Sequence, residues 1–138
     1  MANLYRESVT IIVPLLNEEA NIKSQIRHFR SLPVNEVFFV DGGSLDSTRD
    51  ILKSSGTQWI TSSRGRAVQL NAGATLARSN ILLFVHADTF LYSWHIEEIR
   101  RTMRDPRVVG GRFDIRLSGR HPAFRVIEFF INLRSRLT

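Results

Sequence analysis

The chain has 138 residues, of which 43% are hydrophobic, and a formal net charge of +6. This length and composition suit one globular domain with its own hydrophobic core. The chain has no cysteine, which excludes disulfides and thiolate metal sites, and no apolar run approaches the roughly 20 residues that span a bilayer.

Four short apolar runs in the first part of the chain predict buried β-strands. Each run is rich in β-branched or aromatic side chains, as in strands that are covered on both faces. The runs cover residues 8–13, where we expect Pro14 to end the strand, and then 36–40, 58–61 and 81–85.

Helical patterns separate these runs. Asn17 stands where it can cap the first helix, and Ser44 or Asp46 can cap the second, which we expect to stop at Gly56. A third helix, rich in small residues, is predicted over 66–78. Strands that alternate with helices in this way predict an α/β fold, with a Rossmann-like sheet of four mostly parallel strands and flanking helices.

The remainder of the chain has a different pattern. Residues 93–104 read as a helix, and residues 112–117 alternate apolar and polar side chains, which predicts an antiparallel strand near 107–117. A final helix starts at Pro122 and is apolar on most of its circumference. No repeat or linker interrupts the chain, so we expect a single domain over residues 1–138.

The final helix needs a cover, since a helix that is apolar all round is normally buried or lies against something. It can pack on the sheet, pair with a second copy in a homo-oligomer, or belong to a longer polypeptide. Residues 100–138 hold 10 Arg against 3 acidic residues, so the positive charge is concentrated here. Such a basic face is solvated, or it is suited to anionic lipid or to an acidic partner segment. No interleaving of aromatic and basic residues indicates nucleic acid.

The first residues lack the basic start and long apolar stretch of a secretory signal. We therefore expect a cytoplasmic protein, with peripheral contact at the inner face of the membrane as an open alternative.

Two acidic residues, Asp41 and Asp88, follow the second and fourth predicted strands. In an open parallel sheet, ligands bind outside the carboxyl ends of the strands. Two carboxylates at one such edge suggest a site for a nucleotide and a metal ion. Asp41 is followed by Gly42 and Gly43, which suit a close backbone approach to a ligand or simply a strand-to-helix turn with positive φ. Neither a dinucleotide-binding G-x-G-x-x-G nor a P-loop motif occurs.

His86 and Asp88 are the candidate metal ligands. Mg²⁺ prefers carboxylate and phosphate oxygens, and Mn²⁺ accepts imidazole as well. The alternative for His86 is a structural hydrogen bond. Two other histidines, His28 and His95, fall on predicted helices, where we expect them to face solvent.

Arg66 stands at the start of the third predicted helix and is suited to a phosphate group there, because the free N–H groups of a helix N-terminus add to its charge. A solvated loop is the alternative. Pro14, Asn17 and Glu18 follow the first strand, where turn and capping chemistry explains them as well as a place at the mouth of a nucleotide site.

Four motifs together resemble the family 2 glycosyltransferases, which are inverting enzymes of the GT-A fold. The match spans most of residues 8–90. The motifs are VPLLNE at 13–18, VDGGS at 40–44, RAVQLNAG at 66–73 and FVHADT at 84–89.

The resemblance implies roles for single residues. Asp41 matches the acid that contacts the nucleobase, usually uracil, Arg66 matches a basic residue near base and diphosphate, and Asp88 matches the last Asp of the D-x-D metal motif. Pro14, Asn17 and Glu18 match the first nucleotide-contacting loop. Two departures stand out: Gly42 replaces the second acid of Asp-Asp-Gly-Ser, and His86 replaces the first Asp of D-x-D.

The resemblance therefore implies a divalent-metal-dependent transfer, with Mn²⁺ or Mg²⁺, from a nucleotide sugar, most simply a UDP-sugar, to an unidentified acceptor hydroxyl. No residue after Asp88 matches the family's catalytic base, so the chain resembles the donor-binding portion. A nucleotidyltransferase and a non-catalytic fragment that docks through its basic region are the alternatives.

Overall fold

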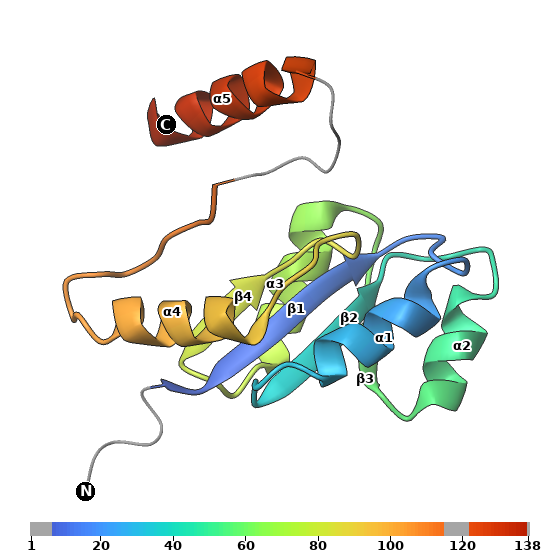
Figure 1. Cartoon of the computed structure of the whole chain (residues 1–138). Coiled ribbons are helices and arrows are strands. Elements are labelled where there is room, and N and C mark those ends of the chain that lie inside the picture. The colour runs from blue at the N-terminus through green and yellow to red at the C-terminus, as the bar shows by residue number, and fades with distance from the viewer. Residues whose placement is uncertain (1–6, 115–121, 138) are drawn as a thin grey trace, which may run out of the picture. The chain divides into compact units, whose positions relative to one another are not determined.

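The computed structural model describes residues 7–114 and 122–137, with the backbone alone for 134–137, and it divides into two compact units, residues 1–108 and 109–138. The first unit contains a parallel sheet of order β3-β2-β1-β4 (Figure 1). The strands are β1 (Val9–Leu15), β2 (Glu36–Asp41), β3 (Gln58–Thr61) and β4 (Ile81–Phe84). The predicted α/β class and all four strands are confirmed.

Strand β1 does not end at Pro14, contrary to the prediction, but runs on to Leu15. The backbone N–H and C=O groups of the even-numbered residues of β1 point toward β4. The Ile12 carbonyl, for example, accepts the Val85 N–H at 3.1 Å. Pro14 has no N–H to continue that ladder, and pairing with β4 stops at Ile12. Pairing with β2 uses the other edge of β1 and continues to Leu15, which lies level with Asp41.

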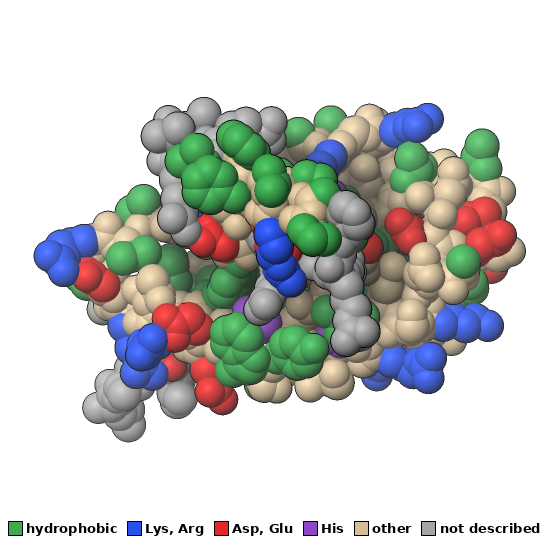
Figure 2. All heavy atoms as spheres, turned by 45° about the horizontal axis from the view of Figure 1, so that its top comes forward, with side chains coloured by type: hydrophobic (Ala, Val, Ile, Leu, Met, Phe, Trp, Pro, Cys, Tyr) green, Lys and Arg blue, Asp and Glu red, His purple; other side chains and the backbone are tan. Residues whose placement is uncertain are grey.

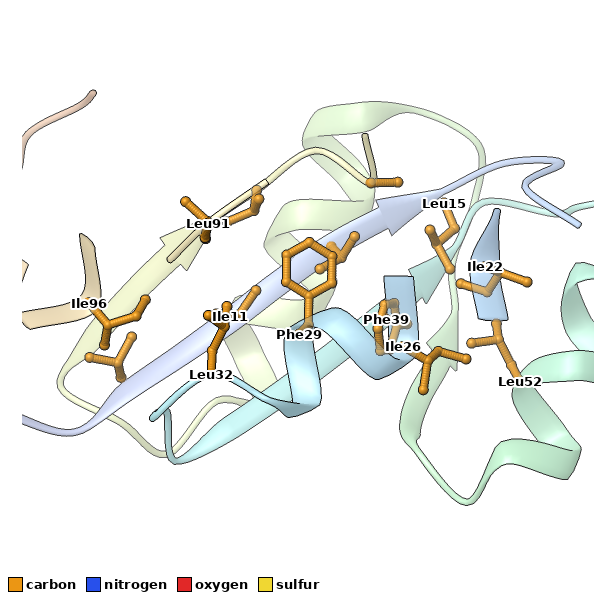
Figure 3. Close-up of a cluster of buried hydrophobic side chains, with 14 of the residues drawn as sticks. Ile11, Leu15, Ile22, Ile26, Phe29, Leu32, Phe39, Leu52, Leu91 and Ile96 are labelled. Atoms are coloured by element: carbon orange, nitrogen blue, oxygen red, sulfur yellow. The ribbon is translucent and has the colours of Figure 1, made fainter. Parts of the chain in front are cut away.

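One face of the sheet carries the main core (Figure 3). Because side chains alternate along a strand, Ile11 and Leu15 of β1 share this face with Phe39 of β2. The helices that cover it are α1 (Ile22–Arg30), α2 (Thr48–Ser55) and α4 (Ser93–Met103). They contribute Ile22, Ile26, Phe29, Leu52 and Ile96, all of them buried.

The opposite face is covered by α3 (Arg66–Leu76), which approaches the sheet through Gly73. A Cβ at Gly73 would lie 2.5 Å from Cγ2 of Ile12 and 3.1 Å from Cγ2 of Val40. The missing side chain of Gly73 therefore allows this helix to lie close to the sheet. The buried residues of α3 are Gln69 and Gly73, whereas Ala67 is exposed.

Two helix starts differ from prediction. Helix α1 begins at Ile22, after Asn21 rather than Asn17, because Asn17 has a φ of 54° and bonds elsewhere. Helix α2 begins at Thr48, whose N–H is accepted by Oδ1 of Asp46 at 3.0 Å, although the N-cap position itself is Ser47. Its end at Gly56, with a φ of 67°, is as predicted.

The second unit contains α5 (Pro122–Leu137), which starts where the sequence predicts. The antiparallel strand predicted near 107–117 is not found where it can be checked, because residues 107–114 form no strand and 115–117 lie outside the described residues. On α5, Arg125 pairs with Glu128 at 2.8 Å. Five large apolar side chains of α5 are exposed, namely Val126, Ile127, Phe129, Phe130 and Leu133, whereas Phe124 and Ile131 are half-buried.

Within the part of the chain that the structure describes, no helix combines the length and apolar character that crossing a bilayer requires.

Candidate functional site

The candidate site lies at the carboxyl edge of the sheet. Asp41 is the last residue of β2, and the segment that carries His86 and Asp88 leaves the end of β4. Since β2 and β4 flank β1 and run parallel to it, both segments emerge at the same edge. Two strand spacings amount to roughly 10 Å. A nucleoside diphosphate can bridge such a distance.

The Asp41 carboxylate is buried and accepts hydrogen bonds from its own loop. Its oxygens accept the N–H of Gly43 at 3.1 Å and that of Ser44 at 3.2 Å. The Arg49 Nε of α2 lies 3.4 Å from Oδ2, and the Arg49 side chain is 44% exposed. We did not predict a role for Arg49. A basic residue in the first turn of a helix is unfavourable next to the helix dipole, so its place in the sequence indicates that it has an acidic partner.

Gly42 is required because a side-chain amide occupies the space beside it. A Cβ on Gly42 would lie 2.8 Å from the Gln69 amide. Gln69 is buried, and its Nε2 donates to the carbonyls of Leu15 and Val40, both at 2.8 Å. The Gln69 amide therefore links the ends of β1 and β2 beneath the loop. The sequence feature that indicates this role is the position of a polar residue, Gln69, four residues before Gly73, which places both on the side of α3 that meets the sheet.

The loop after β1 is bound to the loop after β2. Asn17 donates its N–H to Ser44 Oγ at 2.8 Å and accepts the Leu45 N–H at Oδ1, also at 2.8 Å. The Glu18 N–H donates to Thr48 Oγ1 at 2.8 Å. Asn17 thus connects two loops instead of capping a helix, and the residues of the first motif form part of a preformed rim.

Glu19 and Asp46 add to this rim. The Glu19 N–H donates to Asp46 Oδ2 at 3.0 Å, and the Ser47 N–H donates to Glu19 Oε2 at 2.9 Å. Desolvation raises the pKa of Asp46, but the hydrogen bonds from Thr48 and Glu19 outweigh it, so that this pKa is lowered from its ordinary value. The rim is therefore held by an ionised carboxylate at neutral pH.

Arg66 is the first residue of α3, where the free N–H groups of the helix lie. Its side chain is exposed and has no hydrogen-bond partner among the described residues. The preceding Gly65 has a φ of 140°, which a residue with a side chain rarely adopts. The guanidinium is thus available to an anionic ligand.

His86 and Asp88 lie in a turn that the Thr89 N–H closes on the His86 carbonyl at 3.1 Å. Val85 and Ala87 are buried, whereas His86 and Asp88 are exposed. No group of three or more potential metal-ligating side chains occurs in residues 7–114 and 122–133. One imidazole and one carboxylate fit a divalent ion that takes its other ligands from phosphate and water, which is how Mg²⁺ is commonly bound.

We had expected His28 and His95 to face solvent, but both accept hydrogen bonds from the backbone. His28 Nε2 accepts the Leu91 N–H at 3.2 Å. His95 Nδ1 accepts the Tyr92 N–H at 2.9 Å, and its ring stacks on that of Trp94 with centroids 3.6 Å apart.

A pocket of about 260 Å³ lies at the opposite end of the sheet, at the amino ends of β2 and β3. Its lining includes Val34, Glu36 and Thr57, without a residue of any of the four motifs. The carboxyl edge is therefore the better candidate, even though it forms an open rim.

Comparison with known proteins identifies the family of this chain. The model of the glycosyl transferase family 2 matches residues 10–137. The chain belongs to this family. Among proteins of curated function, none is similar enough in sequence to count as a relative.

Several solved structures share the fold of this family 2 chain. Glucosyl-3-phosphoglycerate synthase from Mycobacterium tuberculosis, in complex with Mn²⁺ and uridine-diphosphate-glucose, is 25% identical, with a TM-score of 0.54, over 60% of this chain and 34% of that one. S. aureus TarS is 18% identical, with a TM-score of 0.60, over 77% of this chain and 23% of that one.

The mannosyltransferase PcManGT from Pyrobaculum calidifontis, in complex with GDP-Man and Mn²⁺, is 21% identical, with a TM-score of 0.57, over 67% of this chain and 31% of that one. The chain thus spans about a third or less of the length of these proteins.

Proposed function

We propose that this chain is the donor-binding portion of an enzyme that transfers a sugar from a nucleoside diphosphate, most simply UDP, to an acceptor hydroxyl with inversion. The observation that carries the proposal is the meeting of Asp41 and the His86–Asp88 turn at one edge of a family 2 sheet. Since the family model reaches residue 137, we treat residues 1–138 as one functional domain.

In this proposal the base and ribose lie against Asp41, Gly42 and Gly43. A base that bonds to the buried Asp41 carboxylate has to displace the partly exposed Arg49 guanidinium. Pro14, Asn17 and Glu18 form the adjoining wall of the site, which their hydrogen bonds to the next loop hold in place.

The diphosphate lies between Arg66 and the turn after β4. Arg66 is free to form charge-assisted hydrogen bonds with phosphate oxygens. Asp88 and His86 would hold Mn²⁺ or Mg²⁺, which stabilises charge on the departing diphosphate when bound. The structure of the related synthase in complex with Mn²⁺ and uridine-diphosphate-glucose supports a divalent metal and a nucleotide sugar as the groups bound here.

An inverting transfer needs a general base near the acceptor hydroxyl. Among the described residues beyond position 106, the acids are Asp114 and Glu128. The Asp114 carboxylate lies 3.8 Å from the guanidinium of Arg112, and the Glu128 carboxylate lies 2.8 Å from that of Arg125. We therefore assign the base to neither of them.

Calorimetric titration with UDP and GDP, with and without Mn²⁺, tests the proposal. We expect Mn²⁺ to tighten the binding of one nucleotide, and we expect Asp88→Asn to abolish that gain while metal-free binding persists. Absence of binding to any nucleoside diphosphate would overturn the proposal.

Docking on an anionic membrane, or on a second copy of the chain, is a second candidate role, favoured by the exposed apolar side chains of α5 and the nearby arginines. It is consistent with a cytoplasmic protein that binds the inner membrane face. Co-sedimentation with acidic liposomes, compared with neutral ones, tests the membrane contact, and a change of molar mass with concentration tests self-association.

A further inference from the structure

The loop after β4 carries the candidate metal ligands and is attached at both ends. At its start the Val85 N–H donates to the Ile12 carbonyl at 3.1 Å. At its end the Leu91 side chain is 5% exposed and belongs to the main core. Between these anchors, His86 and Asp88 are exposed. Their position therefore depends on how firmly both ends of the loop are held.

His28, from the last turn of α1, contacts the far end of this loop. Its Nε2 accepts the Leu91 N–H at 3.2 Å, across 63 residues of sequence. Its ring lies 4.5 Å from the ring of Phe90 and 5.1 Å from that of Phe29, measured between centroids. Figure 2 shows histidine side chains at the surface of the molecule. The imidazole is thus packed between the core and the loop.

The hydrogen bond requires a neutral imidazole. Nε2 can accept an N–H only when it carries no proton, so that the proton lies on Nδ1. Desolvation by burial lowers the pKa of His28 from its ordinary value, and this favours the neutral form. The Ser31 hydroxyl donates to the His28 carbonyl at 2.7 Å and so holds the end of α1 in place.

We propose that His28 is a positioning residue for the turn that carries His86 and Asp88, and that it acts by accepting the Leu91 N–H. Groups that orient metal ligands without touching the metal contribute to metal affinity, because they restrict the conformations of the ligands. The effect on metal binding rests on the proposed function. The attachment of the loop by His28 rests on the geometry alone.

Three variants separate the hydrogen bond from general stability. His28→Leu keeps apolar bulk but removes the acceptor, and His28→Gln restores an acceptor that does not titrate. Ile26→Val is the matched control, because it removes buried volume from the same helix. We expect it to leave the attachment of both ends of the loop unchanged. Circular dichroism establishes that each variant is folded.

Two measurements are made on each variant, namely the Mn²⁺-dependent gain in UDP affinity by calorimetry and the hydrogen exchange of the Leu91 amide by NMR without metal. In His28→Leu we expect the gain to fall by about tenfold and Leu91 exchange to rise by about tenfold, while UDP binding without metal is unchanged. We expect His28→Gln to recover both and Ile26→Val to affect neither.

Unchanged Leu91 exchange in His28→Leu, an equal loss in Ile26→Val, or no recovery in His28→Gln would overturn the proposal. If the parent chain shows no Mn²⁺-dependent binding of either UDP or GDP, the proposed function fails instead. Leu91 exchange in the metal-free protein then still decides whether His28 holds the loop.

Discussion

The two loops that meet at the carboxyl edge of the sheet differ in how they are held. The loop after β2 is bound from several sides: its own Asp41 accepts two N–H groups, Asn17 bonds to it from the loop after β1, and Gln69 lies beneath it. The loop after β4 leaves His86 and Asp88 exposed between its anchors at Val85 and Leu91.

This difference suggests that the two loops have different roles in the proposed site. A loop with internally satisfied polar groups is preorganised, so a base that binds there costs little conformational entropy. An exposed pair of metal ligands, in contrast, is completed only by the diphosphate and the ion. Substitutions in the loop after β2 should therefore lower stability, whereas those in the turn after β4 should lower ligand affinity.

Asp41→Ala has the largest expected effect on stability. It leaves the N–H of buried Ser44 without its acceptor, and it also removes the acceptor of the Gly43 N–H and the partner of the partly exposed Arg49 guanidinium. We expect the free energy of unfolding to fall by about 2–3 kcal/mol. Chemical denaturation followed by circular dichroism measures it, and a loss below about 0.5 kcal/mol, typical of surface sites, would contradict the comparison.

Gln69→Leu should follow closely. The substitution keeps a buried side chain of similar length, but it leaves the carbonyls of Leu15 and Val40 without the amide donor. We expect a loss of about 1–3 kcal/mol in the free energy of unfolding. Exposed Asn71→Leu on the same helix serves as the control and should change stability little. Equal effects of the two substitutions would show that the Gln69 amide contributes nothing special.

A pH effect on stability should be smaller and should depend on His28. Burial lowers the pKa of His28 in the folded protein, so the unfolded chain, with a pKa of about 6.5, takes up a proton first as pH falls. The stabilisation is therefore present above about pH 6.5 and is lost as pH falls through the folded pKa.

Melting temperatures of the parent chain and His28→Gln, compared between about pH 7.5 and 5, test this effect. We expect the parent chain to lose more stability than the variant over that interval. The lowered pKa values of Glu7, Asp46 and Asp105 affect a more acidic range and cancel in the comparison. Parallel curves would contradict the prediction.

Asp88→Asn should change stability least, within about 0.5 kcal/mol, because the Asp88 side chain is exposed and has no partner among the described residues. It should nevertheless remove the Mn²⁺-dependent part of nucleotide binding. A melting temperature well below that of the parent chain would show that the turn after β4 is a structural element, like the loop after β2, and would remove the contrast between them.

The sequence alone predicted the elements of this fold well. The strands 58–61 and 36–40 agree with β3 and β2 to within one residue, and Gly56 ends α2 as expected. Such features depend on apolar periodicity and backbone preferences, which are properties of neighbouring residues. The family motifs likewise led to the carboxyl edge of the sheet, because a parallel sheet brings the ends of its strands together.

The partners of the polar side chains were decided by the tertiary structure. Asn17 bonds to a loop 27 residues away, Gln69 to the end of β1 across 54 residues, and His28 to Leu91 across 63. Residue type shows that such a side chain can cap a helix, bind a ligand or face solvent, but the choice depends on which buried backbone groups need a partner. Those groups come together only when the sheet and helices have packed, and this is why the sequence predicted a candidate site at this edge but not the interactions that hold its loops.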